Sequence, residues 1–141
     1  MVTEVVGSPA LDASLGIVEA RHAVDRAMRR IDLALEANNG IVLKTDANSV
    51  TASFERTEQA ILAACEMLER IKNLPPLAGK RLAVRLGLHY GPIDPDTDPA
   101  ADESVAVATR LLKAARGGEA LATGSVVVLL PAPTRHFARP D

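Results

Sequence analysis

The sequence has very few aromatic residues, a single cysteine and no tryptophan. Phenylalanine and tyrosine make up only 2% of the 141 residues, although 48% of the residues are hydrophobic. The core must therefore be built from alanine, valine, leucine and isoleucine, which pack well between helices and a sheet. The single cysteine, Cys65, excludes an internal disulfide and a zinc site made of cysteines. It lies on the apolar side of a helical pattern, which predicts a buried structural thiol.

The sequence also lacks a long apolar run and a large basic cluster. No apolar run approaches the roughly 20 residues that span a bilayer, and the N-terminus lacks the pattern of a secretion signal. The net charge is −2, and Arg26, Arg29 and Arg30 are better explained as a solvated helix face than as a nucleic-acid surface. We therefore expect one cytoplasmic domain over residues 1–141, with neither nucleic acid nor a membrane as a partner.

Hydrophobic spacing predicts helices separated by short strands. Apolar residues recur at helical spacing over about residues 17–36, 57–72 and 103–115. Strands are expected at about residues 2–6, 41–43, 50–54, 81–88 and 120–123. Residues 126–130 are apolar but too few to classify. Because only residues 46–49 separate two strands, these should form an antiparallel hairpin. The order predicts an α+β fold, a ferredoxin-like antiparallel sheet with helices packed on one face.

Two stretches of the chain carry a recognisable pattern. The first reads K-T-D-A-N-S-V-T-A-S-F at residues 44–54, and the second reads R-L-G-L-H-Y-G-P at residues 85–92. Together with the helix that follows, they resemble the catalytic domain of class III adenylate/guanylate cyclases, in which the stretches read K-T-x-G-D-x-x-x-A-x-F and R-x-G-x-H-x-G-P. The resemblance extends over about residues 3–123 and implies the ferredoxin-like fold of that family, with an N-terminal strand and a C-terminal end shorter than usual.

The resemblance implies a metal site in which several residues are changed. In the family, divalent Mg²⁺ or Mn²⁺ ions help the ribose 3′-hydroxyl to attack the α-phosphorus of a nucleoside triphosphate. The metal-binding positions correspond to Glu4, which replaces an Asp, and to Asn48, whose neutral amide replaces a second Asp. Asp46 in the same turn is a possible substitute ligand, although Asp46 and Asn48 are better explained as turn-forming residues. Glu4 is explained at least as well as an exposed residue near a terminus.

The resemblance also implies positions that hold the nucleotide. Lys44 matches the lysine that helps to recognise adenine in family members that use ATP. Asp98 falls nearest to a second purine-reading position, in a loop that does not align. Arg110 matches the arginine that stabilises charge on the phosphates in the transition state, and it is the candidate catalytic residue. Ala106 replaces the asparagine that positions the ribose, and a further basic residue of the family would lie beyond Asp141.

The sequence therefore keeps the frame of the family and changes part of its chemistry. We expect a divergent cyclase-like domain that is catalytically impaired and acts in intracellular signalling as a dimerising or regulatory module. Its partner would be a second copy or another cyclase domain. Two alternatives stay open: an active adenylate cyclase that converts ATP to cyclic AMP and pyrophosphate, and a non-catalytic sensor that binds a nucleotide such as ATP. Mg²⁺ or Mn²⁺ is required only if the domain is active.

Overall fold

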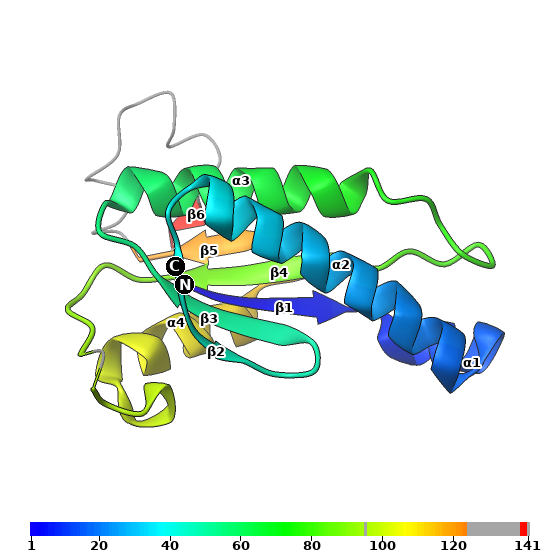
Figure 1. The fold of residues 1–141 in the computed structure, drawn as a ribbon, viewed down its shortest axis with the longest axis horizontal. Coiled ribbons are helices and arrows are strands. Elements are labelled where there is room, and N and C mark those ends of the chain that lie inside the picture. The colour runs from blue at the N-terminus through cyan, green and yellow to red at the C-terminus, as the bar shows by residue number, and fades with distance from the viewer. Residues whose placement is uncertain (95, 124–138, 141) are drawn as a thin grey trace.

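Helices and strands alternate along the chain around one central sheet (Figure 1). The computed structural model describes residues 1–94, 96–123 and 139–140. The strands are β1 (Val2–Val6), β2 (Ile41–Thr45), β3 (Ser49–Ser53), β4 (Ala83–Leu88), β5 (Ala120–Ala122) and β6 (Arg139–Pro140). The helices are α1 (Ser8–Leu15), α2 (Ile17–Ala37), α3 (Thr57–Lys72) and α4 (Glu103–Ala114), preceded by a 3₁₀ turn, η1 (Pro99–Ala101). The predicted helices and strands are confirmed to within a few residues at their ends, and the apolar residues 126–130 lie outside the described residues.

Helix α1 is the longest element that the sequence did not predict; the 3₁₀ turn η1 and the short strand β6 were not predicted either. Gly7, Ser8 and Pro9 indicate a break, but Pro9 lies in the first turn of the helix, where its missing N–H costs no hydrogen bond. Gly16 then separates α1 from α2 with a φ of 86°, a left-handed value that glycine adopts without strain. Leu11, only 1% exposed, attaches α1 to α2 through contacts with alanines of α2.

The sheet has the order β2-β3-β1-β4-β5-β6. Within the run β2-β3-β1-β4, each pair of neighbouring strands is antiparallel. Strands β2 and β3 form the predicted hairpin. Strands β5 and β6 extend the sheet parallel to β4. The predicted α+β class is therefore confirmed, with an antiparallel sheet over its first four strands and a parallel extension at one edge.

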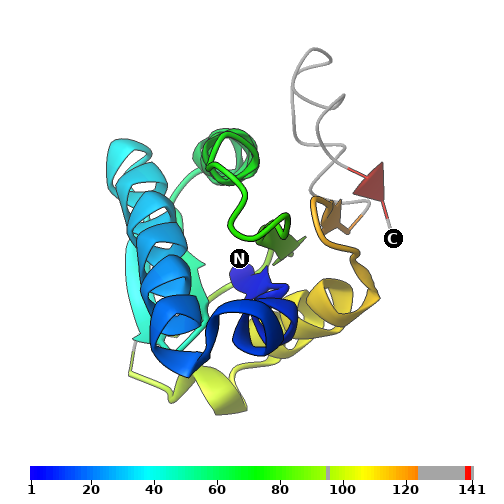
Figure 2. The same ribbon diagram turned by 90° about the vertical axis from the view of Figure 1, so that its right-hand side faces the viewer.

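The helices cover both faces of the sheet, which corrects the prediction that they all lie on one face. Figure 2 shows α2 and α3 on one side of the strands and α4 on the other. Successive residues of β1 point to opposite faces, as in any strand. Thr3 donates a hydrogen bond from its hydroxyl to Met67 Sδ of α3 over 3.6 Å, whereas Val2 packs against Val105 and its neighbours on α4.

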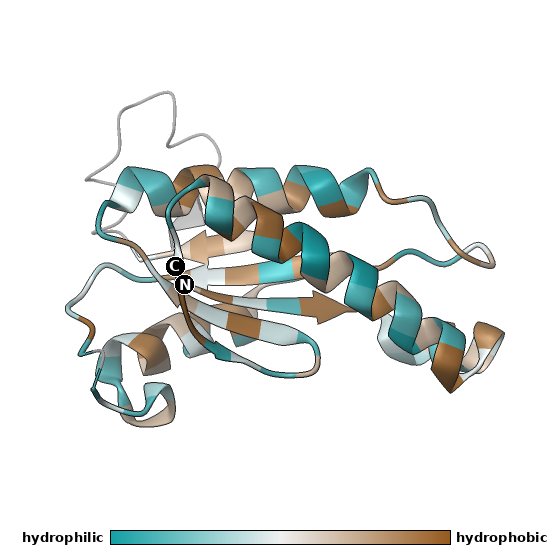
Figure 3. Ribbon diagram, in the orientation of Figure 1, coloured by the Kyte–Doolittle hydropathy of each residue, from teal (hydrophilic) through white to brown (hydrophobic). Residues whose placement is uncertain are grey.

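The larger core lies between the sheet and the two helices α2 and α3. Its largest buried side chains are Ile31, Leu35, Ile61, Met67 and Leu86, each 2% exposed or less. Hydrophilic and hydrophobic residues alternate along both helices, as expected for amphipathic helices (Figure 3). Cys65 packs against this core but is only half-buried, and burial raises the pKa of its thiol. None of the described helices is both long and apolar enough to cross a membrane.

Helix α4 approaches the opposite face closely because of one glycine. A Cβ atom added to Gly87 on β4 would lie 2.0 Å from the carbonyl oxygen of Ala108 and 2.6 Å from the backbone nitrogen of Leu112. No side chain fits at this position without moving the helix. Gly87 therefore sets how near α4 lies to the sheet.

Candidate functional site

A pocket of about 500 Å³ opens between α4 and the strands of the sheet. Strands β1 to β4 and helix α4 all contribute to its lining. The charged residues of the lining are Glu4, Lys44, Asp46, Arg85, Arg110 and Lys113. The fold therefore brings together most of the candidate residues, although they come from distant parts of the sequence.

Glu4 is held by an arginine on the neighbouring strand. Arg85 on β4 is the direct cross-strand partner of Glu4 on β1. Its Nε and Nη2 atoms donate to Glu4 Oε1 over 3.0 and 2.7 Å, and the two side chains are only 26% and 24% exposed for Glu4 and Arg85 respectively. Such a charge-assisted pair is short and strong. The guanidinium thus supplies the positive charge that a divalent metal would supply at this carboxylate.

Asn48 uses its polar groups to join the β2–β3 turn to β1. Its side-chain amide donates to the carbonyl oxygen of Val5 over 3.3 Å, and the Val5 N–H donates to the carbonyl oxygen of Asn48 over 2.8 Å. Asn48 is half-buried and does not belong to the lining of the pocket. The structure places this residue beside the pocket, with its amide turned toward the backbone of β1.

The same turn presents Asp46 to the pocket. The Asp46 N–H donates to the Ser49 carbonyl oxygen over 2.8 Å, and Ser49 Oγ donates to Asp46 Oδ2 over 3.4 Å. These contacts are typical of an aspartate that stabilises a turn. On the other side of the turn, Arg21 of α2 donates to the Ala47 carbonyl oxygen while it pairs with Asp25. The turn is therefore fixed to both α2 and β1.

Lys44 and Arg110 reach the pocket from opposite walls. Lys44 follows an irregularity in the pairing of β2 with β3, between Val42 and Lys44, and is exposed. Arg110 is exposed on α4, one turn before Lys113. Ala106 also lines this wall. A short methyl side chain thus stands where the family has its ribose-positioning asparagine.

Asp102 positions α4 and is a residue that the sequence did not single out. It is only 8% exposed, and its Oδ1 atom accepts from the N–H groups of Ser104 and Val105 over 2.8 and 3.2 Å. This is the geometry of a helix N-cap. The pattern of an aspartate two residues before a serine, at the start of an apolar helical repeat, was the available signal.

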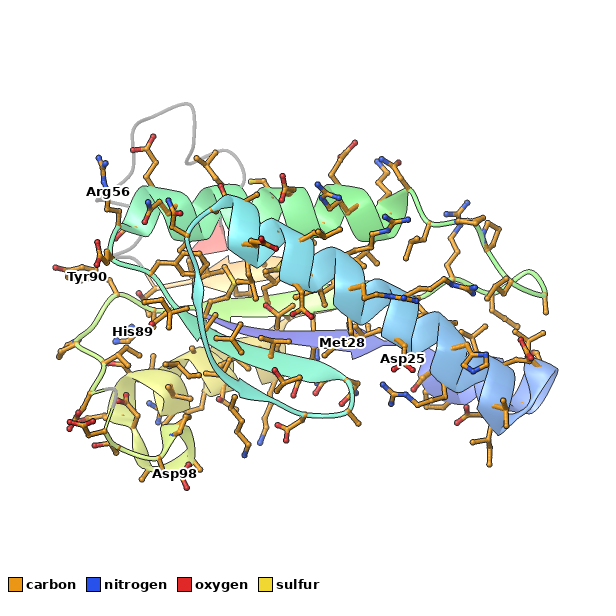
Figure 4. All side chains as sticks on the ribbon, viewed as in Figure 1. Asp25, Met28, Arg56, His89, Tyr90 and Asp98 are labelled. Carbon is orange, nitrogen blue, oxygen red and sulfur yellow. The ribbon has the colours of Figure 1, made fainter. Side chains whose placement is uncertain are left out.

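Asp98 is not part of the pocket lining, although the next two residues, Pro99 and Ala100, are. It is exposed and accepts a hydrogen bond from the Ala100 N–H over 3.0 Å, which caps the 3₁₀ turn. Figure 4 shows Asp98 at the lower edge of the molecule, in the segment that leads to α4. The structure does not bring this residue together with Lys44 or Arg110 in one lining.

The residues present do not fit a pair of divalent metals. The carboxylate of Glu4 faces a fixed guanidinium, Asn48 is neutral and turned toward Val5, and Asp46 is engaged within its turn. Mg²⁺ at such sites is usually held by one or two free carboxylates together with water and substrate phosphates. In the part of the chain that the structure describes, no group of three or more His, Cys, Asp or Glu side chains is placed to hold a metal ion.

Lys113 is a pocket residue that the sequence did not single out, and Arg85 was noticed only as part of the R-L-G-L-H-Y-G-P stretch. Arg85 is recognisable as a charge in an otherwise apolar strand, but only the register with β1 shows that it faces Glu4. Lys113 falls on the Arg110 side of α4 by helical spacing, one turn further along. Neither signal states a partner or a pocket.

Comparison with solved structures identifies the fold. No family model and no curated sequence matches the chain. The chain is similar to a dimeric guanylyl cyclase domain of the RhoGC fusion protein from the fungus Blastocladiella emersonii, with 13% identity and a TM-score of 0.73 over 91% of this chain and 79% of that one. An adenylate cyclase from Trypanosoma brucei gives 20% identity and a TM-score of 0.77 over 96% and 76% of the two chains.

A bacterial protein shows the same likeness. The adenylyl cyclase CyaB from P. aeruginosa is 16% identical, with a TM-score of 0.65 over 91% of this chain and 76% of that chain. The chain therefore has the fold of the class III nucleotide cyclase catalytic domain. The expected resemblance is confirmed at the level of the fold.

Proposed function

We propose that this chain is a catalytically impaired class III cyclase-like domain that acts as a dimerising or regulatory module in intracellular signalling. The observation that supports this proposal is the contact of Asn48, whose neutral amide donates to the Val5 carbonyl oxygen at the position where the family pattern has an aspartate. The methyl group of Ala106 removes a further contact. Together these changes weaken metal and ribose binding while the frame of the fold stays intact.

A cyclase assay tests the loss of activity. We expect formation of cyclic nucleotide from ATP or GTP, with Mg²⁺ or Mn²⁺, to be at least about 10²-fold slower than for an active class III domain measured beside it, since individual active-site contacts are worth factors of this size. The rate should also not rise with the concentration of this protein. Product formation that scales with protein concentration would contradict the proposal.

A partner domain is the second part of the proposal. Strand β2 forms one edge of the described sheet, and it exposes Ile41 and Val42 by 56% and 47%. An open edge with apolar side chains favours association. The fungal guanylyl cyclase domain with the same fold has been solved both as a non-canonical dimer and as a monomer. We therefore propose that this edge packs against a second domain of the same fold, either another copy or an intact cyclase domain.

Light scattering on the purified chain tests this edge. We expect Ile41→Asp to lower the dimer fraction, alone or in a mixture with an active cyclase domain, because a charge would be buried in the contact. Leu62→Asp is the matched control, since Leu62 is also exposed, by 48%, but lies on α3. Equal effects of the two substitutions would show that the β2 edge is not the contact.

One observation favours an active adenylate cyclase as the alternative. Asp46 and Glu4 line the same pocket, so two carboxylates do approach one space. If this alternative holds, cyclic AMP forms from ATP with Mg²⁺ or Mn²⁺ and both Glu4→Ala and Asp46→Ala reduce its rate strongly. A residual rate that neither substitution changes would exclude these residues as ligands.

A further inference from the structure

We infer that a second cavity, at the end of the sheet where α3 begins, binds a small planar aromatic carboxylate. This cavity, which we call the end cavity, has a volume of about 440 Å³ and shares no residue with the pocket between α4 and the sheet. Its volume is in the range of sites for small ligands. Figure 4 shows three of its lining residues, Arg56, His89 and Tyr90, at one end of the molecule. The inference does not depend on the proposed loss of cyclase activity.

Aromatic residues are concentrated at the end cavity. The whole chain contains two phenylalanines and one tyrosine, and both Phe54 and Tyr90 belong to this lining. Aliphatic side chains of the lining include Ile41, Leu88 and Ile93. Aromatic rings attract one another in stacked or edge-to-face contacts, in addition to the effect of the apolar area that they bury. The lining therefore favours a planar aromatic ligand over a purely aliphatic one.

The Phe54 side of the cavity is fixed before any ligand arrives. A Cβ atom added to Gly40 would lie 3.0 Å from both Cε1 and Cζ of the Phe54 ring, so the glycine allows the ring to lie against the connection between α2 and β2. Phe54 also packs against the larger core. A ring that is already held in place loses little freedom on binding, which lowers the cost of association.

The segment after β4 forms another wall, and it is held by α4 and by the residue after β5. Ser104 Oγ donates to the Pro92 carbonyl oxygen over 2.9 Å. Gly91 passes so close to α4 that an added Cβ atom would lie 2.5 Å from Ser104 Oγ. His89 Nδ1 lies 3.3 Å from the Thr123 hydroxyl oxygen. The cavity is therefore a preformed space with fixed walls.

Two side chains of the lining favour a carboxylate on the ligand. Within the described part of the chain, Nε2 of His89 and the guanidinium of Arg56 form no hydrogen bond or ion pair. His89 Nε2 is a donor in the tautomer whose Nδ1 accepts from the Thr123 hydroxyl, and arginine donates strongly to a carboxylate. Glu55 also lines the cavity and opposes an anion, so the preference for negative charge should be modest.

Calorimetry on the purified chain tests the ligand class with three related molecules. We expect 2-naphthoate to bind with a Kd below about 1 mM. Decahydro-2-naphthoate, which lacks aromatic rings, and 2-naphthylmethylammonium, which carries the opposite charge, should each bind several-fold more weakly. Absence of binding at millimolar 2-naphthoate would overturn the inference. Equal or tighter binding of either analogue would also overturn the assigned ligand class.

A substitution that fills the cavity locates the ligand. We expect Ala60→Leu to weaken 2-naphthoate binding by about tenfold or more, because Ala60 lines the cavity and the larger side chain occupies its volume. Ala114→Leu is the matched control, since Ala114 is an exposed helical alanine on α4 outside this lining. Circular dichroism verifies that both variants are folded. Equal losses in the two variants would place the ligand elsewhere and overturn the site.

Tyr90→Ala keeps the test decisive if Ala60→Leu disturbs the fold. Tyr90 is 59% exposed, so its removal leaves the core intact. We expect 2-naphthoate to bind about two- to tenfold more weakly, as for the loss of one aromatic contact. Unchanged binding by this variant would contradict the inference.

The neighbours Arg56 and Glu55 test the carboxylate by the sign of two effects. Arg56→Gln should weaken 2-naphthoate binding several-fold, and Glu55→Gln should strengthen it several-fold, because each substitution removes one charge from the lining. Changes in the same direction would overturn the charge assignment. These variants avoid Ile41, which also lies on the β2 edge proposed as a contact with a second domain. A failure of that proposed contact therefore leaves this test unaffected.

Discussion

The two faces of the sheet are made by the same strands, but they differ in chemistry. The face under α2 and α3 is filled with apolar side chains such as Leu86 and Val5. The face under α4 has a small apolar contact at Val2 and, next to it, the ion pair of Glu4 with Arg85. The difference shows that the fold depends mainly on one face, while the other is free to change its charged residues.

This division explains how the fold persists while site residues change. Solved structures with the same fold are only 10% to 20% identical to this chain, yet the layers are preserved. An apolar core tolerates exchanges of similar volume, so little sequence identity is needed to keep it. The charged residues of the pocket are half-buried or exposed, and their replacement leaves that core untouched.

The largest loss of stability is expected from a cavity in the core between the sheet and α3. Leu86→Ala should lower the free energy of unfolding by roughly 3 to 5 kcal/mol, because Leu86 is fully buried and the cavity cannot collapse. Urea denaturation followed by circular dichroism measures this loss. Ile41→Ala, at an exposed apolar position, should change stability by less than about 0.5 kcal/mol. Similar losses for both would mean that this face is not the main core.

The second largest loss of stability is expected at Gly87, where α4 lies close to the sheet. Gly87→Ala should cost about 2 to 3 kcal/mol, since the new methyl group would meet backbone atoms of α4. Gly16→Ala is the comparison, because Gly16 has a left-handed φ but open space around it, and it should cost only about 1 kcal/mol. Thermal unfolding of the two variants ranks them. A milder effect at Gly87 would show that α4 moves away from the sheet easily.

The cap of α4 comes third. Asp102→Ala should lower the free energy of unfolding by about 1 to 2 kcal/mol, because the N–H groups of Ser104 and Val105 lose their acceptor. Asp102→Asn keeps an acceptor oxygen and should recover most of the loss. Chemical denaturation of both variants measures it. An equal loss in the two would mean that charge, and not the hydrogen bonds, holds the start of the helix.

The smallest effect on stability is expected at the ion pair itself. Glu4→Gln should change the free energy of unfolding by less than about 1 kcal/mol, because the pair is partly exposed and solvent screens it. A stability loss as large as that of Leu86→Ala would erase the distinction between the two faces.

Much of the fold is predictable from local patterns. Helices α2, α3 and α4 follow from apolar spacing, and the hairpin follows from the short turn between its strands. Helix α1 was not predicted, because Gly7 and Pro9 at its start indicate a break in the chain as readily as the start of a helix. The position of α4 on the opposite face also escapes, because local spacing shows which side of a helix is apolar but not which face of the sheet it covers.

The sequence indicates which residues line the pocket, but not which residues they contact. The resemblance to cyclases indicated Glu4, Lys44, Asp46 and Arg110, and the fold brings these into one lining. Asp98 was placed by counting through a loop, and loops do not preserve spacing. The partner of Glu4 depends on the register between β1 and β4, which no local pattern of residues 85–92 reveals. The functional roles of all these residues stay predictions.

The hydrogen bonds between Asn48 and Val5 make this position selective for an amide. A carboxylate at position 48 would set an oxygen atom against the Val5 carbonyl and would have to rotate away from β1. Asn48→Asp would therefore loosen the contact between the hairpin and β1. The hairpin alone thus favours a neutral side chain here, whatever the neighbouring pocket binds.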